Sequence, residues 1–157
     1  MNNYSVQQYQ KSDYVHWNAF IGQAKNATFL FHRDFMEYHK DRFEDFSLMV
    51  YEGQKLVAVL PANRVSDTVF SHQGLTYGGL VYSPKLNAEK VEAILDSLLS
   101  FFKENEVQTF YYKPIPSFYS SKGNAETDFF MLKKGSFLDR KEMNLAINLA
   151  MPLTISK

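Results

Sequence analysis

The clearest pattern of apolar and polar positions lies in residues 87–105. There the apolar residues return about every 3.6 positions, which is the period of an α-helix. They form one stripe: Val91, Ile94, Leu95, Leu98, Phe101 and Phe102. Asn87 precedes the stripe and can cap the helix, and Glu89 favours the positive end of the helix dipole. The pattern therefore predicts an amphipathic helix over 87–105 with one face in the core.

Shorter patterns predict the remaining elements. Helical spacing predicts helices within 13–25, 31–40 and 126–133. In the second of these, Phe31, Phe35 and Tyr38 would share one face. Alternating or continuous apolar runs predict strands at 4–9, 46–51, 55–64, 68–72, 75–82, 107–112 and 141–150.

The order of these elements predicts the fold class. Glu52-Gly53-Gln54 is typical of a hairpin turn, and Pro61 is expected at an edge or a bulge. Antiparallel strands come first, and a strand–helix–strand crossover follows. This order favours an α/β (α+β) fold with a mixed, mostly antiparallel sheet and helices on both faces. A length of 157 residues predicts a single domain over 1–157.

Composition excludes several classes of function. The 17 Lys and Arg balance the 17 Asp and Glu, which argues against a dedicated DNA-binding protein. The chain has no cysteine, so a disulfide framework, a zinc–thiolate site and a cysteine nucleophile are excluded. No segment is apolar enough for a membrane span, and the first residues lack the pattern of a signal peptide. We therefore expect a cytoplasmic protein.

Aromatic residues make up 16% of the chain, which is the unusual feature of its composition. We expect the phenylalanine-rich stretches to be core rather than a ligand site. These residues are Phe29, Phe31, Phe35, Phe43, Phe101, Phe102, Phe129 and Phe130.

Several stretches, in this order, resemble the Fem-type (FemAB-like) branch of the GNAT acyltransferase superfamily. They are FLFHRDFMEYH (29–39), DRFEDFSL (41–48), LPAN (60–63), SHQGLTYGG (71–79), YKPIPSFY (112–119) and ETDFF (126–130). The resemblance implies transfer of an acyl or aminoacyl group to an amine or sugar acceptor, in cell-surface polysaccharide or peptidoglycan metabolism. Acyl-CoA or aminoacyl-tRNA would be the donor. Fem-type proteins have two GNAT-like halves, and this chain matches the first.

The resemblance also identifies a departure at the donor site. GNAT enzymes hold the CoA pyrophosphate on backbone N–H groups of a glycine-rich loop before the third helix. Here that place, 81–87, has no glycine, and Pro84 removes one donor. We therefore expect this chain to be the acceptor-side half and to bind no donor by itself.

The predicted acceptor site combines two segments. Tyr77, Gly78 and Gly79 can let a ligand approach the backbone closely, although paired glycines also suit a bulge in an edge strand. Lys113 and Tyr119 lie in a proline-rich loop after a predicted strand, where ligands commonly bind in α/β folds. Together with Tyr111 and Tyr112, Tyr119 could stack on a sugar, or the loop could simply face solvent.

Two further possibilities concern histidines. His72 is a candidate general base, and the alternative is a hydrogen-bonded structural histidine. His32 with Asp34 or Glu37 does not complete a metal-binding pattern, so no metal site is expected.

The sequence also admits alternative functions. The missing pyrophosphate loop also suits a non-catalytic interaction or dimerisation module with a degenerate GNAT fold. Its partner would be a second GNAT-like half or a second copy of the chain. The tyrosines admit a carbohydrate-binding domain.

Overall fold

A computed structural model describes residues 4–39, 41–120 and 123–141 of the chain. One four-stranded sheet has the order β1-β3-β4-β7, and all its pairs are antiparallel. Its strands are β1 (Tyr4–Gln8), β3 (Leu48–Glu52), β4 (Lys55–Leu60) and β7 (Val81–Tyr82). The turn between β3 and β4 contains Gly53 at φ +62°, which confirms the predicted hairpin.

The second four-stranded sheet has the order β2-β5-β6-β8. Its strands are β2 (Glu44–Asp45), β5 (Asn63–Val65), β6 (Thr68–Phe70) and β8 (Thr109–Tyr111). β6 and β8 run parallel, and the other pairs are antiparallel. The predicted strand 55–64 crosses from one sheet to the other, because it is interrupted at Pro61 and Ala62.

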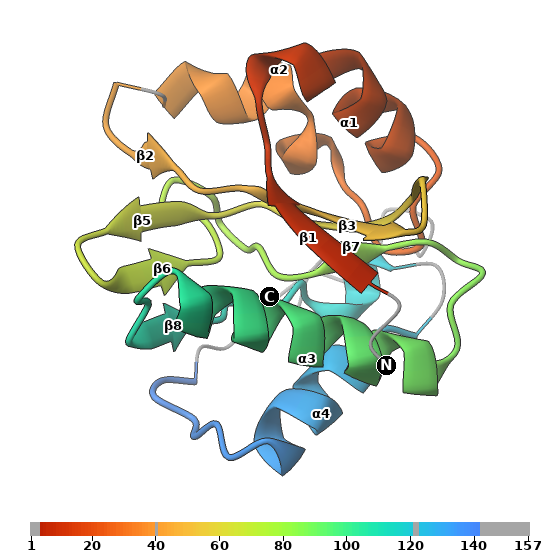
Figure 1. Ribbon diagram of the computed structural model, residues 1–157, viewed down its shortest axis with the longest axis vertical. Helices are drawn as coiled ribbons and strands as arrows, with labels where there is room; N and C mark the ends of the chain where they lie inside the picture. The colour runs from red at the N-terminus through yellow and green to blue at the C-terminus, as the bar shows by residue number, and fades with distance from the viewer. Residues whose placement is uncertain (1–3, 40, 121–122, 142–157) are drawn as a thin grey trace, which may run out of the picture.

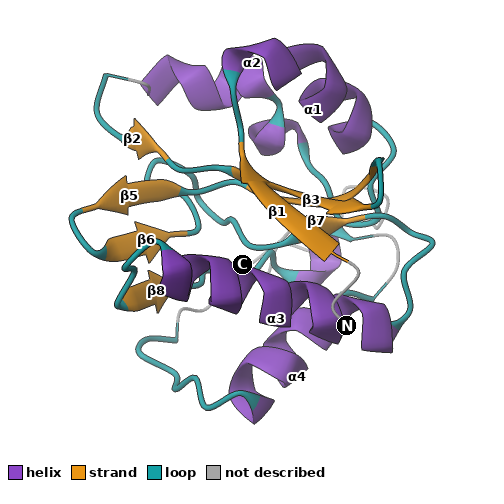
Figure 2. Cartoon of the chain, in the orientation of Figure 1, coloured by secondary structure: helices purple, strands orange, loops and turns teal. Residues whose placement is uncertain are grey.

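Helices cover both faces of the sheets, as the order of elements predicts (Figures 1 and 2). They are α1 (Tyr14–Ile21), α2 (Arg33–Met36), α3 (Ala88–Glu104) and α4 (Glu126–Lys133), with short 3₁₀ turns η1 (Lys11–Asp13), η2 (Phe29–Phe31), η3 (Glu37–His39) and η4 (Ser117–Tyr119). Figure 1 shows α1 and α2 on one face and α3 and α4 on the other. The structure therefore confirms a mixed α/β fold.

Two buried clusters lie on opposite faces of the β1-β3-β4-β7 sheet. On the α3 side, the helix stripe Val91, Ile94 and Leu98 packs against strand residues such as Val57 and Leu60. On the α1 side, Trp17 and Phe20 pack with residues that include Met49, Val59 and Val81. Ala58, Val59 and Leu60 alternate between the two clusters, as expected of a strand covered on both faces. The register of β3 and β4 shifts at Val57, so Val57 and Ala58 both belong to the α3-side cluster.

α3 forms as the sequence predicts. The Asn87 side chain accepts a hydrogen bond from the Lys90 N–H at 3.0 Å, which is an N-cap contact. The predicted stripe is buried, apart from the half-buried Phe101. α4 also has the predicted bounds, and Gly135 follows it at φ +91°.

The two N-terminal helices differ from the prediction. The first ends at Ile21 instead of continuing to Lys25, because the residues after Gly22 turn away to pack on β7. In the second, the predicted face is wrong. Phe31 is fully buried, but Tyr38 is 80% exposed and Met36 takes the inward position. The short helix and the 3₁₀ turns do not keep one period, so the expected stripe does not form.

The expectation that the phenylalanines are all core is also wrong in part. Phe31, Phe102 and Phe130 are buried, whereas Phe29, Phe35 and Phe129 are exposed. Phe29 and Phe35 contact each other edge to face at 5.4 Å between ring centroids. Adjacent phenylalanines on a helix point in different directions, so Phe129 and Phe130 cannot both enter one core.

Two of the predicted strands do not appear as strands over their expected lengths in the described residues. In 75–82 only Val81 and Tyr82 pair as a strand, because the preceding residues form a loop. The predicted strand 141–150 lies outside the described residues, apart from its first position. Across 4–39, 41–120 and 123–141, no helix has the length and apolar character needed to cross a membrane.

Candidate functional site

The candidate site is built around a loop between β6 and β7. The chain leaves β6 at Ser71 and returns beside it at Gly78. The Ser71 N–H donates to the Tyr111 carbonyl at 2.9 Å, and the Lys113 N–H donates to the Ser71 hydroxyl at 2.7 Å. The Gly78 N–H donates to the Lys113 carbonyl at 2.9 Å. Residues 72–77 are therefore a loop whose two ends are held together by the segment after β8.

Both predicted glycines are required by close contacts. A Cβ on Gly78 would lie 1.7 Å from the Ser71 carbonyl oxygen, which no side chain tolerates. Gly79 has φ +91°, and a Cβ there would lie 2.8 Å from the Tyr112 hydroxyl. The glycines thus allow the backbone to pack on Ser71 and Tyr112. Neither glycine lies in a strand, so the expected bulge in an edge strand does not form here, and a role of these glycines in acceptor binding stays a prediction.

The predicted acceptor-site residues lie together. The rings of Tyr77 and Tyr119 are 5.0 Å apart between centroids. The Lys113 carbonyl accepts the hydrogen bond from the Gly78 N–H, so Lys113 lies beside the same segment. Tyr77 is buried and its hydroxyl donates to the Thr28 hydroxyl at 3.0 Å. Burial also raises the pKa of Tyr77, so its hydroxyl stays protonated. Tyr77 is therefore a buried residue on which the exposed Tyr119 packs.

The loop 114–119 carries the exposed part of this site. Phe118 and Tyr119 are about half exposed, and their rings lie 4.6 Å apart between centroids. Ile115 is buried and anchors the loop, and its carbonyl accepts from the Asn124 side chain at 3.4 Å. Prolines on both sides of Ile115 limit backbone motion. The result is a fixed aromatic surface over Tyr77, with the exposed Lys113 on the adjoining backbone.

His72 occupies the start of the 72–77 loop in an unusual conformation. Its φ is +67°, and its side chain is only 6% exposed. Its ring packs edge to face on Phe43 at 5.9 Å between centroids. Such backbone strain is common at functional sites but also arises at tight turns. A role for His72 as the base stays a prediction.

Residues 25 and 26 close the outer edge of β7. The Asn26 side-chain amide donates to the Leu80 carbonyl at 2.9 Å and accepts from the Tyr82 N–H at 3.1 Å. The Lys25 N–H donates to the Tyr82 carbonyl at 2.8 Å. Among the strands in the described part of the chain, β7 pairs only with β4, since β8 pairs with β6, and these contacts bond backbone groups on the other edge of β7. Ligands often bind where neighbouring strands diverge, and here the chain itself occupies that edge.

A partly buried charge cluster reinforces this closure. The Lys25 ammonium lies 2.7 Å from a Glu126 carboxylate oxygen, and the Tyr82 hydroxyl donates to the other oxygen at 2.9 Å. Burial alone would raise the pKa of Glu126, but the hydrogen bonds from Lys25 and Tyr82 hold it below its usual value. Burial, followed by the bond to Glu126, raises the pKa of Tyr82. The cluster therefore ties α4 to β7 and to the loop after α1.

Tyr112 fills the same region from the side of β8. The Leu80 N–H donates to its hydroxyl at 3.4 Å. Burial raises the pKa of Tyr112 to about 12, so the phenol stays neutral. Tyr112 is thus a packing residue and is not in a position to stack on a sugar together with Tyr119.

The place of the expected pyrophosphate loop does not fit a CoA pyrophosphate. The Ser83 N–H donates to the Val57 carbonyl at 2.9 Å, and Pro84 has no N–H. The Lys85 N–H donates to the Ser83 hydroxyl at 3.3 Å, and the Leu86 N–H donates to the Ser83 carbonyl at 3.2 Å. The N–H groups of 83–86 are therefore used within the chain and do not converge on an anion. This agrees with the departure seen in the sequence.

Sequence reasoning missed the role of Lys25, Asn26 and Glu126. The available signal was a polar Lys-Asn pair directly after the predicted first helix, which marks a loop but not its partner. No group of three or more His, Asp and Glu side chains within the described ranges could hold a metal ion.

Comparison with known proteins bears on the fold. No protein-family model and no curated protein matches the chain. Among solved structures, it is similar to the ribosomal-protein-S18-alanine N-acetyltransferase from Escherichia coli, with TM-score 0.57 and 14% identity, over 84% of this chain and 76% of that one. It is also similar to the aminoglycoside 6'-N-acetyltransferase AAC(6')-Ih from Acinetobacter baumannii, with TM-score 0.54 and 13% identity, over 93% and 99%.

A third similar structure is TTHA1254 from Thermus thermophilus, in a single-residue mutant form, with TM-score 0.51 and 14% identity, over 92% of this chain and 97% of that one. At these identities the likeness concerns architecture. Because two N-acetyltransferases are among its structural neighbours, and because its own sheets are covered by helices on both faces, this chain has the GNAT fold.

Proposed function

We propose that this chain is a Fem-like acyltransferase domain that binds the acceptor, while the acyl donor is held by another polypeptide segment or a second GNAT-like half. The GNAT fold supports an acyltransferase domain in general. The finer assignment to peptidoglycan or cell-surface polysaccharide acceptors rests on the Fem-type resemblance.

The observation that carries the proposal is the contrast between two places in the fold. At 83–86 the backbone N–H groups are consumed internally, and the edge of β7 is closed by Asn26. At the other end of β7, Tyr119 and Phe118 present an exposed and rigidly supported aromatic surface. Aromatic faces pack against the apolar faces of sugar rings, and Lys113 adds a positive charge for an acidic acceptor.

The chemistry expected of the complete enzyme is acyl transfer. The acceptor amine or hydroxyl attacks the acyl carbonyl carbon and forms the new C–N or C–O bond. The bond from that carbon to the donor breaks, and the acceptor loses one proton to a base. We keep His72 as the candidate base in this proposal. Because its ring is buried against Phe43, it acts only on an acceptor that reaches into the 72–77 loop.

Thermal unfolding of this chain with acetyl-CoA tests the donor half of the proposal. A ligand at about one hundred times its Kd would stabilise the fold by about 2.7 kcal/mol, a shift of a few degrees in Tm. We expect acetyl-CoA at millimolar concentration to give no larger shift than the same concentration of a simple phosphomonoester, since acetyl-CoA itself carries a phosphomonoester, and we expect no acetyl transfer by the chain alone. A reproducibly larger shift with acetyl-CoA would show that the chain holds a donor. The proposed place of action is the cytoplasm.

A second candidate function is a non-catalytic module that pairs with a second copy or a second half. It is favoured by the exposed apolar residues on and after α4: Phe129, Leu132, Phe137 and Leu138. Exposed apolar residues gathered in one segment commonly mark interaction surfaces. Sedimentation of the wild type and of Phe129→Glu/Leu132→Glu tests it. A concentration-dependent dimer that the double variant abolishes would support this function, and a monomer at all concentrations would count against homodimerisation.

A further inference from the structure

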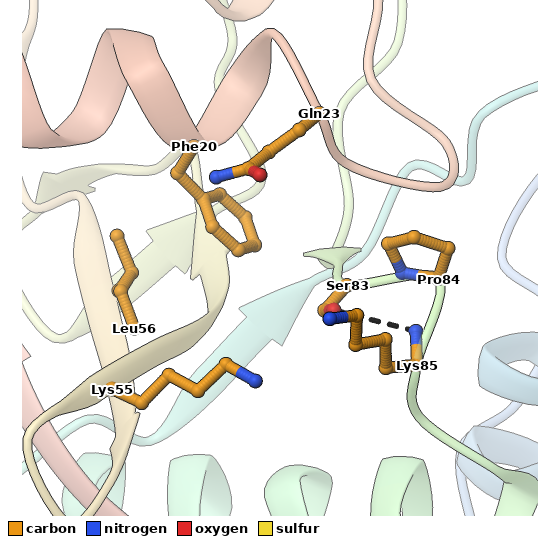
Figure 3. A pocket seen from close by; sticks show the side chains of 7 residues that line it. All are labelled: Phe20, Gln23, Lys55, Leu56, Ser83, Pro84 and Lys85. Atoms are coloured by element: carbon orange, nitrogen blue, oxygen red, sulfur yellow. Dashed lines mark hydrogen bonds between the residues drawn. The ribbon is translucent and has the colours of Figure 1, made fainter.

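An open pocket lies at the carboxyl end of β7, on the sheet face that carries α1 (Figure 3). Its volume is about 100 Å³. Segments far apart in the sequence line it: Phe20, Gln23, Lys55, Leu56, Ser83, Pro84 and Lys85. They come from the end of α1 and the turn that follows it, the start of β4 and the turn after β7. The pocket is thus formed by tertiary packing.

The polar lining is positively charged. Figure 3 shows the ammonium groups of Lys55 and Lys85 directed toward the middle of the pocket. Neither lysine forms an ion pair with another described residue, and none of the described lining residues is acidic. The nearest acid of the hairpin, Glu52, is bound by the Lys90 ammonium at 2.8 Å. Two positive charges therefore face one small space in a chain of zero net charge.

Neutral donors and an apolar floor complete the lining. The Ser83 hydroxyl oxygen accepts from the Lys85 N–H, which leaves its proton available to a ligand. The Gln23 side chain provides an amide N–H₂ group. Phe20 and Leu56 are 4% and 6% exposed and form a buried apolar floor.

We propose that this pocket binds a small phosphomonoester. Its phosphate dianion lies between Lys55 and Lys85 and accepts from Ser83, while its organic part contacts Leu56 and Pro84. A dianion matches two ammonium groups, and the tetrahedral oxygens accept from several directions, whereas a carboxylate carries one charge in one plane.

This site is separate from the proposed acceptor site. Tyr77 and Gly79 precede β7, and Ser83 and Lys85 follow it, so the two sites lie at opposite ends of the strand. The site also uses side chains rather than the backbone N–H groups of 83–86, which are bonded internally. The inference therefore does not depend on the proposed function, and either can fail alone.

The test is a titration of the ¹⁵N-labelled full chain at constant ionic strength, followed by amide chemical shifts. The probes are inorganic phosphate, phenyl phosphate and benzoate. We expect the largest shifts at the amides of Ser83 and Lys85 and at the Gln23 side chain. Phenyl phosphate should bind more tightly than inorganic phosphate because of the apolar floor, and benzoate more weakly than phenyl phosphate.

Two double variants test whether the positive charges of Lys55 and Lys85 bind the phosphate. Lys55→Gln/Lys85→Gln should weaken phenyl phosphate binding about tenfold or more. Lys11→Gln/Lys103→Gln removes the same charge from exposed lysines outside the pocket and should leave binding unchanged. Thermal unfolding confirms that each variant is folded. An equal loss in both double variants, shifts centred elsewhere, no saturable binding, or benzoate binding as tightly as phenyl phosphate would overturn the inference.

Discussion

The carbonyl oxygen of Ser71 lies where the side chain of Gly78 would begin. A Cβ on Gly78 would approach that oxygen to 1.7 Å. The same two residues are bonded to Tyr111 and Lys113, so this contact closes the neck of the 72–77 loop. The position of Tyr77 under Tyr119 follows from it, since Tyr77 is the last residue before the neck.

Gly78→Ala should therefore destabilise the fold strongly. The methyl group meets backbone atoms, which cannot rotate away, and the loop neck must open. We expect a loss of about 3 kcal/mol or more in the free energy of unfolding, measured by urea denaturation. Gly22→Ala is the matched control, because a Cβ there meets its nearest atom at an ordinary 3.6 Å. A near-neutral Gly78→Ala would mean that the neck is open in solution.

The fold could be predicted where a local pattern decides the structure. α3 follows from its apolar stripe and its Asn87 cap, and α4 has the bounds that helical spacing predicts. The prediction failed where tertiary contacts decide. The first helix stops at Ile21 because residues 25 and 26 form hydrogen bonds with residues 80–82. Nothing in the sequence around residues 25 and 26 identifies β7 as their partner. Phe29 and Phe35 are exposed because 3₁₀ turns break the helical period.

Asn26→Leu should leave two buried backbone groups of β7 without partners, the Leu80 carbonyl and the Tyr82 N–H. The side chain of Asn26 is buried and bonds to both. Because each unpaired buried group costs about 1–3 kcal/mol, we expect a loss of about 3 kcal/mol in stability. Hydrogen exchange at the Tyr82 amide should accelerate more than at Val50 in the centre of β3. Unchanged exchange at Tyr82 would contradict the closure of this edge.

The residues predicted to bind the acceptor lie close together in the structure, but their geometry could not be predicted. Tyr77, Lys113 and Tyr119 do lie together, because β8 runs parallel to β6 and brings the following loop beside Gly78. The same pairing could not be read from alternation alone, since residues 72–77 leave the strand. Tyr112 belongs to the core side of this junction because Gly79 makes room for it.

The ion pair of Lys25 and Glu126 should give the stability a dependence on pH. The pKa of Glu126 lies below its ordinary value of 4.5 in the folded state. The unfolded chain therefore binds more protons as the pH falls below that value, and the contribution of Glu126 is lost as the pH falls through the folded pKa.

Chemical denaturation between pH 6 and pH 3 checks this, with buffers spaced by about half a unit. Glu126→Gln should be less stable than the wild type at pH 6, and the difference should shrink toward pH 3. Glu104→Gln is the control, because Glu104 is exposed on α3 and forms no ion pair with another described residue. The free energy of unfolding of this variant should change with pH as that of the wild type does. A constant difference between Glu126→Gln and the wild type would refute the electrostatic role.

Tyr119→Ala should separate acceptor binding from stability. Tyr119 is 53% exposed and packs on Tyr77, so its removal should cost only about 1 kcal/mol of folding free energy. If the aromatic surface binds the acceptor, affinity for soluble peptidoglycan disaccharide peptides should fall about tenfold, measured by calorimetry. Phe137→Ala removes an exposed aromatic residue after α4 and should change neither quantity. Full binding by Tyr119→Ala would move the acceptor away from this surface, and equal losses in both variants would show that contact with these fragments is non-specific.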